Sequence, residues 1–122
     1  MTNYKHGDIV LVLFPDSNLQ TAKKRPALII QADNLQTGLP QVIVAMITSN
    51  MKRAGHPSRV TILLNSFEEN RSGLQSDSVI VTDNLATVQE KFIYKVIGNL
   101  SAIDKANAKS ALAHTFGLNP VE

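Results

Sequence analysis

The apolar residues of this chain are gathered in short runs. The longest are Ile9 to Phe14 and Val42 to Ile47, and both are built mainly from β-branched or bulky side chains. Runs of this length and composition are typical of buried β-strands. A helix that spans a bilayer needs about 20 apolar residues, so the pattern predicts a mainly β protein with no membrane segment.

Shorter apolar runs, separated by turn residues, predict further strands along the chain. These are expected at Ala27 to Gln31, Arg59 to Leu64 and Ser78 to Thr82, with a short one at Leu85 to Val88. Helical turns are expected at Ser66 to Asn70 and at Glu90 to Tyr94, and a break is expected at Gly98. Two long surface loops are predicted, at Asp16 to Lys24 and at Met51 to Ser58.

Residues 101 to 117 predict one longer helix. Ser101 is placed as its N-cap, and Gly117 provides its stop signal. Apolar residues recur near helical spacing at Ile103, Ala106, Ala108, Ala111, Leu112 and Phe116. Many short strands followed by a terminal helix predict a small, strongly bent β-barrel or sheet with helical decoration.

The 122 residues fit a single domain, 1–122, which is long enough to bury a core. The chain has no cysteine, and its three histidines are widely spaced, so neither disulfides nor a metal site is expected. The N-terminal residues lack the apolar core of a signal peptide, which favours the cytoplasm. A net charge of +2 and a pI near 9.0 permit binding to nucleic acid without requiring it.

Three consecutive cations, Lys23, Lys24 and Arg25, run directly into Pro26 and an apolar segment. Pro26 disfavours helix for the residue before it, so Arg25 is expected in an extended conformation at the mouth of a strand. A guanidinium held there suits a phosphate, because its planar fork matches two oxygens. The alternative is that Arg25 is an ordinary solvated charge at a strand end.

Two hydroxyl residues, Thr48 and Ser49, follow the strand Gln41 to Ile47. They could donate to a phosphate oxygen, or simply bond to nearby backbone. A second basic cluster comprises Lys52, Arg53, His56 and Arg59, with no acid between Asp33 and Glu68. Such a cluster either binds a nucleic-acid backbone or forms a solvated face, and His56 is either a loop histidine or a base.

Several common catalytic signatures are absent from the sequence, including a glycine-rich phosphate loop, Gly-x-Ser-x-Gly, His-Glu-x-x-His and a cysteine nucleophile. Any chemistry must therefore use arginine, hydroxyl, aspartate or a lone histidine. An arginine at one strand start and a threonine at another strand end suit phosphoryl transfer better than acyl transfer.

The order of segments resembles the MazF/PemK/Kid family of toxin endoribonucleases from type II toxin–antitoxin systems. The resemblance runs from Lys5 to about Leu112, and each motif is weak alone, whereas their order and spacing are specific. The matching segments are Gly7 to Val10, Lys24 to Ile30, Val42 to Ser49, Asp77 to Ile80 and Ile97 to Ser101.

The resemblance implies a compact SH3-like barrel of the PemK/CcdB toxin type with a C-terminal helix, usually a homodimer. It implies metal-independent, cofactor-free cleavage of single-stranded RNA at short sequences, and inhibition by a cognate antitoxin. Arg25 and Thr48 match the family's catalytic pair, and Asp77 matches a further catalytic aspartate. The residues expected to contact RNA are Lys23, Lys24, Ser49, Lys52, Arg53, His56 and Gln75.

Two departures from the family pattern concern the proton relay. Many members carry an acidic segment before the arginine, where this chain has Asn18 to Lys23, and some carry an arginine where it has Gln75. A non-enzymatic gyrase poison of the CcdB type is the first alternative. That family uses a tryptophan-containing tail, and this chain has no tryptophan. A plain SH3-like module that binds RNA or peptide is the second.

Overall fold

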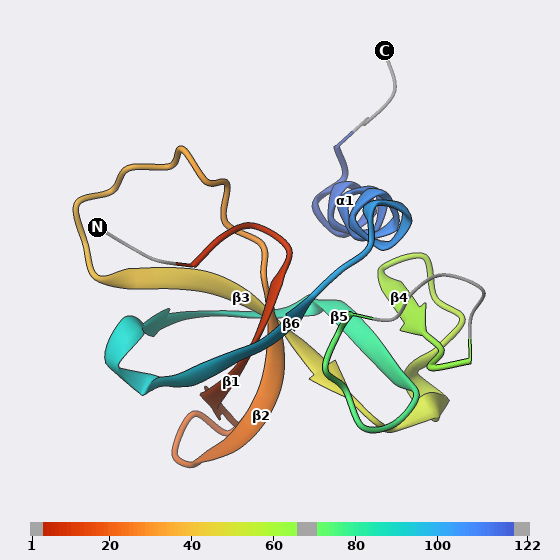
Figure 1. The fold of residues 1–122 in the computed structure, drawn as a ribbon, viewed down its shortest axis with the longest axis horizontal. Coiled ribbons are helices and arrows are strands. Elements are labelled where there is room, and N and C mark those ends of the chain that lie inside the picture. The colour runs from red at the N-terminus through yellow and green to blue at the C-terminus, as the bar shows by residue number, and fades with distance from the viewer. Residues whose placement is uncertain (1–3, 66–70, 119–122) are drawn as a thin grey trace.

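The structure is a computed structural model, and it describes residues 4–65 and 71–118. It contains a single sheet, one α-helix and two short 3-10 helices (Figure 1). In chain order the elements are β1 (Asp8–Pro15), β2 (Ala22–Ile29), β3 (Gln41–Thr48), η1 (Met51–Arg53), β4 (Arg59–Ile62), β5 (Ser78–Gln89), η2 (Glu90–Phe92), β6 (Ile93–Asn99) and α1 (Ala102–Phe116).

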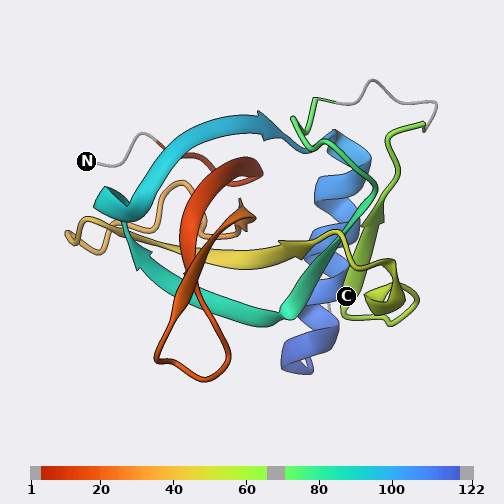
Figure 2. The same ribbon diagram turned by 90° about the horizontal axis from the view of Figure 1, so that it is seen from below.

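The six strands form one antiparallel sheet in the order β4-β5-β3-β2-β1-β6. The sheet curls strongly, so that β6 and β1 arch over the other strands when the molecule is viewed from below (Figure 2). The edge strands β4 and β6 do not pair with each other, so the curled sheet is barrel-like without being closed. The predicted mainly β fold with a C-terminal helix is confirmed.

Both faces of the central strands are buried, which explains why their sequences are continuously apolar rather than alternating. Along β3, Val44 and Met46 join one hydrophobic cluster inside the curl, whereas Ala45 and Ile47 join a second cluster on the opposite face. The second cluster includes Ala108 of α1. The helix therefore covers part of this second cluster.

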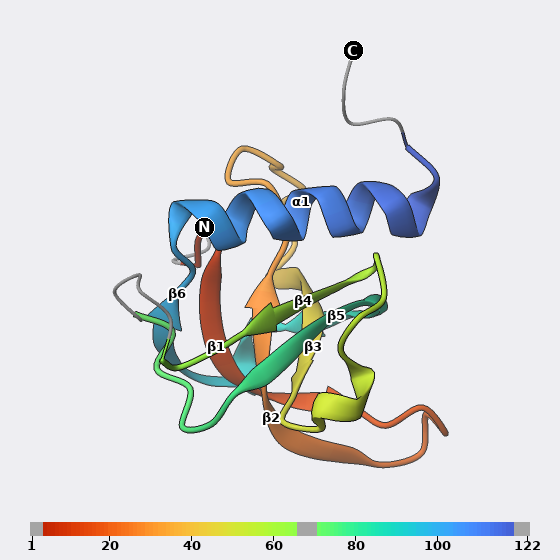
Figure 3. The ribbon, with the colours of Figure 1, turned by 90° about the vertical axis from the view of Figure 1, so that its right-hand side faces the viewer.

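Helix α1 packs against β4 and β5 and lies across one end of the sheet, with β2 and the β1–β2 loop at the far end (Figure 3). Ser101 caps its N-terminus by accepting from Asp104 N, and Gly117 ends it in the left-handed conformation. Both caps agree with the sequence prediction. The predicted apolar face is only partly right, because Ile103 and Phe116 are exposed and the buried contact is made by alanines.

Strand β2 begins at Ala22, so the prediction that Ala22 to Lys24 belong to a loop is wrong. These residues pair with β1, with Lys23 opposite Phe14 and Lys24 opposite Leu13. The loop between the strands is reduced to Asp16 to Thr21. Pairing with β1 outweighs the polar composition of this segment.

Strand β5 is one long strand, so the prediction of two separate strands is wrong. Its register against β3 shifts between Val81, opposite Met46, and Leu85, opposite Ala45. Thr82, Asp83 and Asn84 therefore form a bulge. Bulges redirect side chains out of the regular alternation. Thr82 and Asp83 both bond to Ser58, whereas Asn84 donates to Met46 Sδ.

Strand β6 continues through Gly98, so the predicted break at this residue is wrong. A Cβ atom at position 98 would collide with the backbone of Arg71 and Ser72, and Asn99 N donates to Arg71 O at 2.9 Å. Glycine is needed here for close approach of two backbones. The turn predicted at Glu90 to Tyr94 appears as η2, and the one predicted at Ser66 to Asn70 lies outside the described residues.

No helix in the described part of the chain is both long enough and apolar enough to cross a membrane.

Candidate active site between two hollows

Arg25 and Thr48 both lie just beyond the end of the β2–β3 ladder, and they line the same two hollows. The ladder pairs Ile29 with Val44 and Ala27 with Met46. The ladder stops there, before Pro26, which has no N–H to donate. Continuing the same register by two residues would place Arg25 across from Thr48. Because side chains alternate along a strand, both residues extend the row of Ala27 and Met46 beyond the end of the buried core.

Two hollows meet at this pair. The first, which we call the groove, has a volume of about 830 Å³, and the second, the loop hollow, has a volume of about 680 Å³. Arg25 and Thr48 line both of them. The groove is also lined by Leu11, Lys24, Pro26, Ile47, Ser49, Gly73, Leu74, Gln75, Ser76, Ser78, Lys95, Val96 and Ile97. The loop hollow is also lined by Pro15, Asp16, Ser17, Asn18, Thr21, Lys23, Met46, Arg53 and Asn84.

The guanidinium of Arg25 is only loosely held. One nitrogen lies 3.5 Å from Asp16 Oδ1, and the Arg25 side chain is 30% exposed. A good charge-assisted contact is about 2.7–2.9 Å, so this ion pair is long. Its other N–H groups have no acceptor among the described residues, and they are free to bind an anion.

Asp16 is fixed by its own loop. Thr21 Oγ1 donates to Asp16 Oδ2 at 2.6 Å, and Asp16 N donates to Thr21 O at 2.8 Å. The Thr21 hydroxyl is the main cause that lowers the pKa of Asp16, and the charges of Lys23 and Arg25 lower it further. Asp16 is therefore ionised at neutral pH, and it is a weak proton acceptor.

The hydroxyl of Thr48 also keeps an unused hydrogen-bond donor. Its oxygen accepts from Asn50 N at 3.1 Å, while its proton has no acceptor within residues 4–65 and 71–118. Asn50 in turn caps η1 by accepting from Lys52 N. The half-buried Thr48 is therefore held at the strand end with one donor directed to neither backbone nor side chain.

Arg59, one of the two arginines in the predicted second basic cluster, is held by contacts within the fold. Its Nε and one terminal nitrogen donate to Asp83 at 3.1 and 2.8 Å, and its remaining terminal nitrogen donates to Arg53 O at 3.1 Å. The hydrogen bonds from Arg59 lower the pKa of Asp83, and the same hydrogen bonds raise the pKa of Arg59. The bulge in β5 thus supplies an acid to a cluster that has no acid near it in the sequence.

Residues 5–116 match the family described as PemK-like, MazF-like toxin of type II toxin–antitoxin systems. The chain belongs to this toxin family.

Relatives agree with the family match. Endoribonuclease MazF of Staphylococcus epidermidis is 32% identical over 116 residues, covering 94% of this chain and 92% of the relative. The solved Mycobacterium tuberculosis toxin MazF-mt6 is 26% identical, with a TM-score of 0.70 over 92% of this chain and 98% of that one. A mycobacterial endoribonuclease solved with its cognate antitoxin has a TM-score of 0.73 at 18% identity, covering 95% and 97% of the two chains.

Most of the residues predicted from the sequence to bind or cleave RNA line one of the two hollows. Lys24, Ser49 and Gln75 line the groove, while Lys23 and Arg53 line the loop hollow. The alternation along β2 separates the two lysines, because adjacent side chains on a strand point to opposite faces. The consecutive cations Lys23 and Lys24 therefore place positive charge in both hollows.

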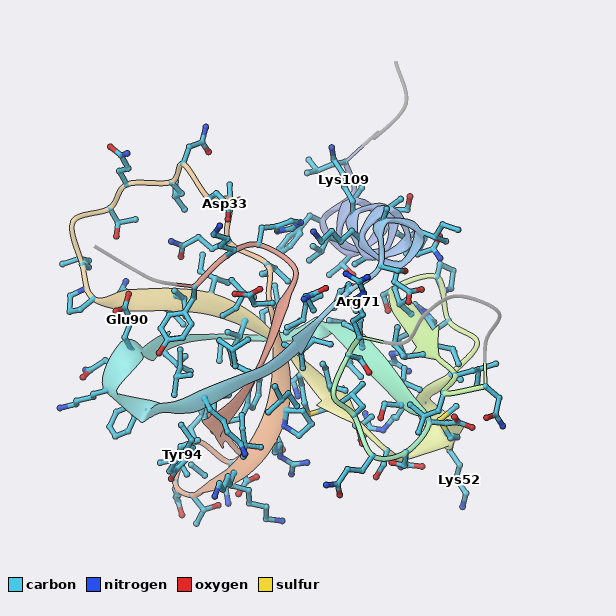
Figure 4. All side chains as sticks on the ribbon, in the orientation of Figure 1. Asp33, Lys52, Arg71, Glu90, Tyr94 and Lys109 are labelled. Atoms are coloured by element: carbon cyan, nitrogen blue, oxygen red, sulfur yellow. The ribbon has the colours of Figure 1, made fainter. Side chains whose placement is uncertain are left out.

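Lys52 and His56 line neither hollow. Lys52 is exposed on η1, on the side of the molecule away from Tyr94 (Figure 4). His56 Nδ1 accepts from Ser58 N at 3.1 Å and lies 2.7 Å from Ser58 Oγ, and its ring meets that of His114 edge-on. These contacts give His56 a structural role in joining the η1–β4 loop to α1.

Asp77 is the one predicted catalytic residue that lines neither hollow. Its side chain accepts from Leu64 N at 2.9 Å, whereas Ser76 and Ser78 on either side of it line the groove. The assignment of Asp77 to catalysis stays a prediction.

Three further residues line the two hollows without a clear signal in the sequence. Asp16 joins Arg25 from the β1–β2 loop, Asn84 reaches the loop hollow from the bulge in β5, and Lys95 reaches the groove from β6. Asn84 Nδ2 donates only to Met46 Sδ, at 3.3 Å, and sulfur is a weak acceptor. Among the described residues, no three His, Cys, Asp or Glu side chains form a group that could hold a metal ion.

Proposed function

We propose that this chain is a toxin that cleaves single-stranded mRNA at short sequences, without a metal ion, and that a cognate antitoxin inhibits it. Its family and the name of the staphylococcal relative support the ribonuclease activity. One observation carries the assignment to a site. Arg25 has unused donors beside the unused hydroxyl proton of Thr48, where two hollows meet.

The proposed reaction is an in-line transesterification within the RNA. The 2′-oxygen of one ribose forms a bond to the adjacent phosphorus, and the bond from phosphorus to the 5′-oxygen of the next nucleotide breaks. The 2′-hydroxyl proton leaves to a base, and a proton is delivered to the departing 5′-oxygen. The products are a 2′,3′-cyclic phosphate and a 5′-hydroxyl.

Arg25 and Thr48 act on the phosphorane in this scheme. The charge that develops on the non-bridging oxygens is stabilised by donors that are already in place, and Arg25 provides two such donors from one fork. Thr48 donates its free hydroxyl proton to orient the same group. An arginine side chain stays protonated at neutral pH, so we assign Arg25 to charge stabilisation rather than to proton removal.

The surroundings of the pair suit a polyanionic strand. Lys24 and Lys95 line the groove, and Lys23 and Arg53 line the loop hollow, so an RNA strand crossing the pair meets cations on both sides. The same charges would attract an acidic antitoxin segment folding over the groove. We also propose that the toxin acts as a homodimer in the cytoplasm, where mRNA is found.

Cleavage of a long single-stranded RNA in excess EDTA tests the activity. The wild type should cut, leaving ends that mass analysis identifies as 2′,3′-cyclic phosphate and 5′-hydroxyl. Arg25→Ala should be roughly a hundredfold to a thousandfold slower. The charge-matched control is Lys109→Ala, which lies on α1 and lines neither hollow (Figure 4), and it should cut normally. An inactive wild type, or equal rates for Arg25→Ala and the wild type, would overturn the proposal.

The role of Asp77 is tested separately. Asp77→Asn keeps an oxygen that can accept from Leu64 N but removes the charge. If Asp77 transfers a proton, the cleavage rate of the variant should fall. Its plot of rate against pH should also lose either the rising or the falling side of the bell. A rate and profile like those of the wild type would remove Asp77 from the catalytic set and leave it with the contact to Leu64.

A further inference from the structure

Two exposed aromatic residues, Phe92 and Tyr94, lie two positions apart in the chain, and each ring has a lysine over it. Phe92, at the end of η2, is 41% exposed, and Tyr94, on β6, is 56% exposed. Lys91 Nζ lies 5.4 Å from the Phe92 ring centre, and Lys24 Nζ lies 4.6 Å from the Tyr94 ring centre. We call these four residues the aromatic edge.

The aromatic edge is continuous with the groove. Lys24 belongs to both, because it lines the groove while its ammonium covers Tyr94. Lys95 and Val96, which follow Tyr94 directly on β6, also line the groove. A single-stranded nucleic acid that leaves the groove past Lys24 and Lys95 therefore reaches Tyr94 next.

The charge of this region fits a polyanion. Lys24, Lys91 and Lys95 lie on or beside it, and β6 contains no acid. The nearest acid along the chain is Glu90, at the start of η2. Aromatic rings interspersed with lysines match single-stranded nucleic acid, since bases stack on the rings while the cations follow the phosphates.

We propose that the aromatic edge extends the RNA site beyond the groove, and that bases flanking the cleavage site stack on Tyr94 and Phe92. This inference rests on the proposed ribonuclease function. The lysines now over the rings would move to phosphates when the bases take their places. The edge would then add affinity for longer RNA without touching the reacting phosphate.

A purely structural role for the two lysine–ring pairs makes a different prediction. Exposed cation–π pairs add slightly to stability, so removal of the rings would lower the melting temperature and leave RNA binding unchanged. The two roles are separated by measuring affinity against RNA length.

The test uses RNA that binds but cannot be cut, because a 2′-deoxy nucleotide replaces the attacking ribose at a mapped cleavage site. Fluorescence anisotropy compares a strand of about five nucleotides with one of about fifteen. Tyr94→Ala and Phe92→Ala should each weaken binding of the long strand by roughly fivefold to a hundredfold. Binding of the short strand should change less than twofold.

Two further variants sharpen the comparison. Tyr94→Phe keeps the ring and should bind the long strand like the wild type. Phe116→Ala removes an aromatic side chain that is 58% exposed on α1, and it should change neither affinity.

Equal affinity of Tyr94→Ala and the wild type for the long strand would overturn the inference. Because the probe is not cleaved, this result does not depend on activity. The ribonuclease proposal would still stand if wild-type cleavage were intact.

Discussion

Arg25 and Asp16 lie 3.5 Å apart across the mouth of the β1–β2 loop, close enough for attraction but beyond the length of a good hydrogen bond. The carboxylate is fixed by Thr21, so it restrains the guanidinium without using up its donors. We interpret Asp16 as a positioning residue for Arg25. Its lowered pKa argues against a role as the general base.

Asp16→Asn should slow cleavage on the order of tenfold, because a loosened cation is less well placed against the transition state. The loss should be mainly in kcat, with a smaller change in KM, in steady-state cleavage of a defined RNA. Asp16 stays ionised well below neutral pH, so the pH profile between 5 and 9 should keep its shape. A variant faster than the wild type would mean instead that Asp16 holds Arg25 away from the substrate.

Thr48→Val should reduce the cleavage rate by roughly a hundredfold, because it removes one donor to the phosphorane while preserving the shape of the side chain. Thr48→Ser keeps the hydroxyl and should remain close to wild type. Thr61→Val, on the exposed face of β4, is the matched control and should cleave normally. Similar rates for Thr48→Val and Thr48→Ser would contradict the role given to the hydroxyl.

Asp83→Asn should lower the melting temperature at pH 7, because it breaks the two-point contact with Arg59. The pKa of Asp83 is lowered in the folded protein, mainly by the hydrogen bond from Arg59. The contribution is therefore present above the ordinary aspartate pKa of about 3.9. It is lost as the pH falls through the lower, folded value.

Thermal unfolding followed by circular dichroism at pH 7 and below pH 3 measures this dependence. The wild type and Asp83→Asn should differ at pH 7 and converge in acid. Glu90→Gln is the control, since Glu90 makes no ion pair among the described residues. A difference that persisted unchanged in acid would show that the contact is not electrostatic.

Gly98→Ala should destabilise the fold and loosen one wall of the groove. The added methyl group would collide with the backbone of Arg71 and Ser72, which cannot move aside as a flexible side chain could. The cost should be about 1–3 kcal/mol in the free energy of unfolding, and KM for RNA should rise because Gly73 to Gln75 line the groove.

Gly38→Ala is the comparison for this variant, because nothing lies within 4 Å of the added atom, although the residue has a positive φ of 76°. It should cost only the conformational strain of about 1–2 kcal/mol and leave KM unchanged. Urea denaturation and steady-state cleavage measure the two effects. A change in KM for Gly38→Ala as large as that for Gly98→Ala would undermine the link between Gly98 and the groove.

The sequence by itself determined the features that depend on neighbouring residues. The apolar runs specify β1 and β3, and their lack of alternation matches strands buried on both faces. Ser101 and Gly117 fix the ends of α1, because capping is decided within one turn of the helix. Local signals also placed the two candidate catalytic residues. Pro26 placed Arg25 on a strand, and the end of an apolar run placed Thr48 at a strand end.

Only the tertiary structure decided which arginine is available for chemistry. Arg25 and Arg59 both precede apolar strand residues, but Arg59 is held at 2.8 and 3.1 Å by an acid 24 positions away, whereas Arg25 meets its acid at 3.5 Å. The difference follows from sheet order and from the bulge that directs Asp83 toward β4 and Asn84 toward the loop hollow. The residues that meet across a sheet depend on how strands distant in the chain pair with one another, and the residues around Arg25 or Arg59 alone do not specify that pairing.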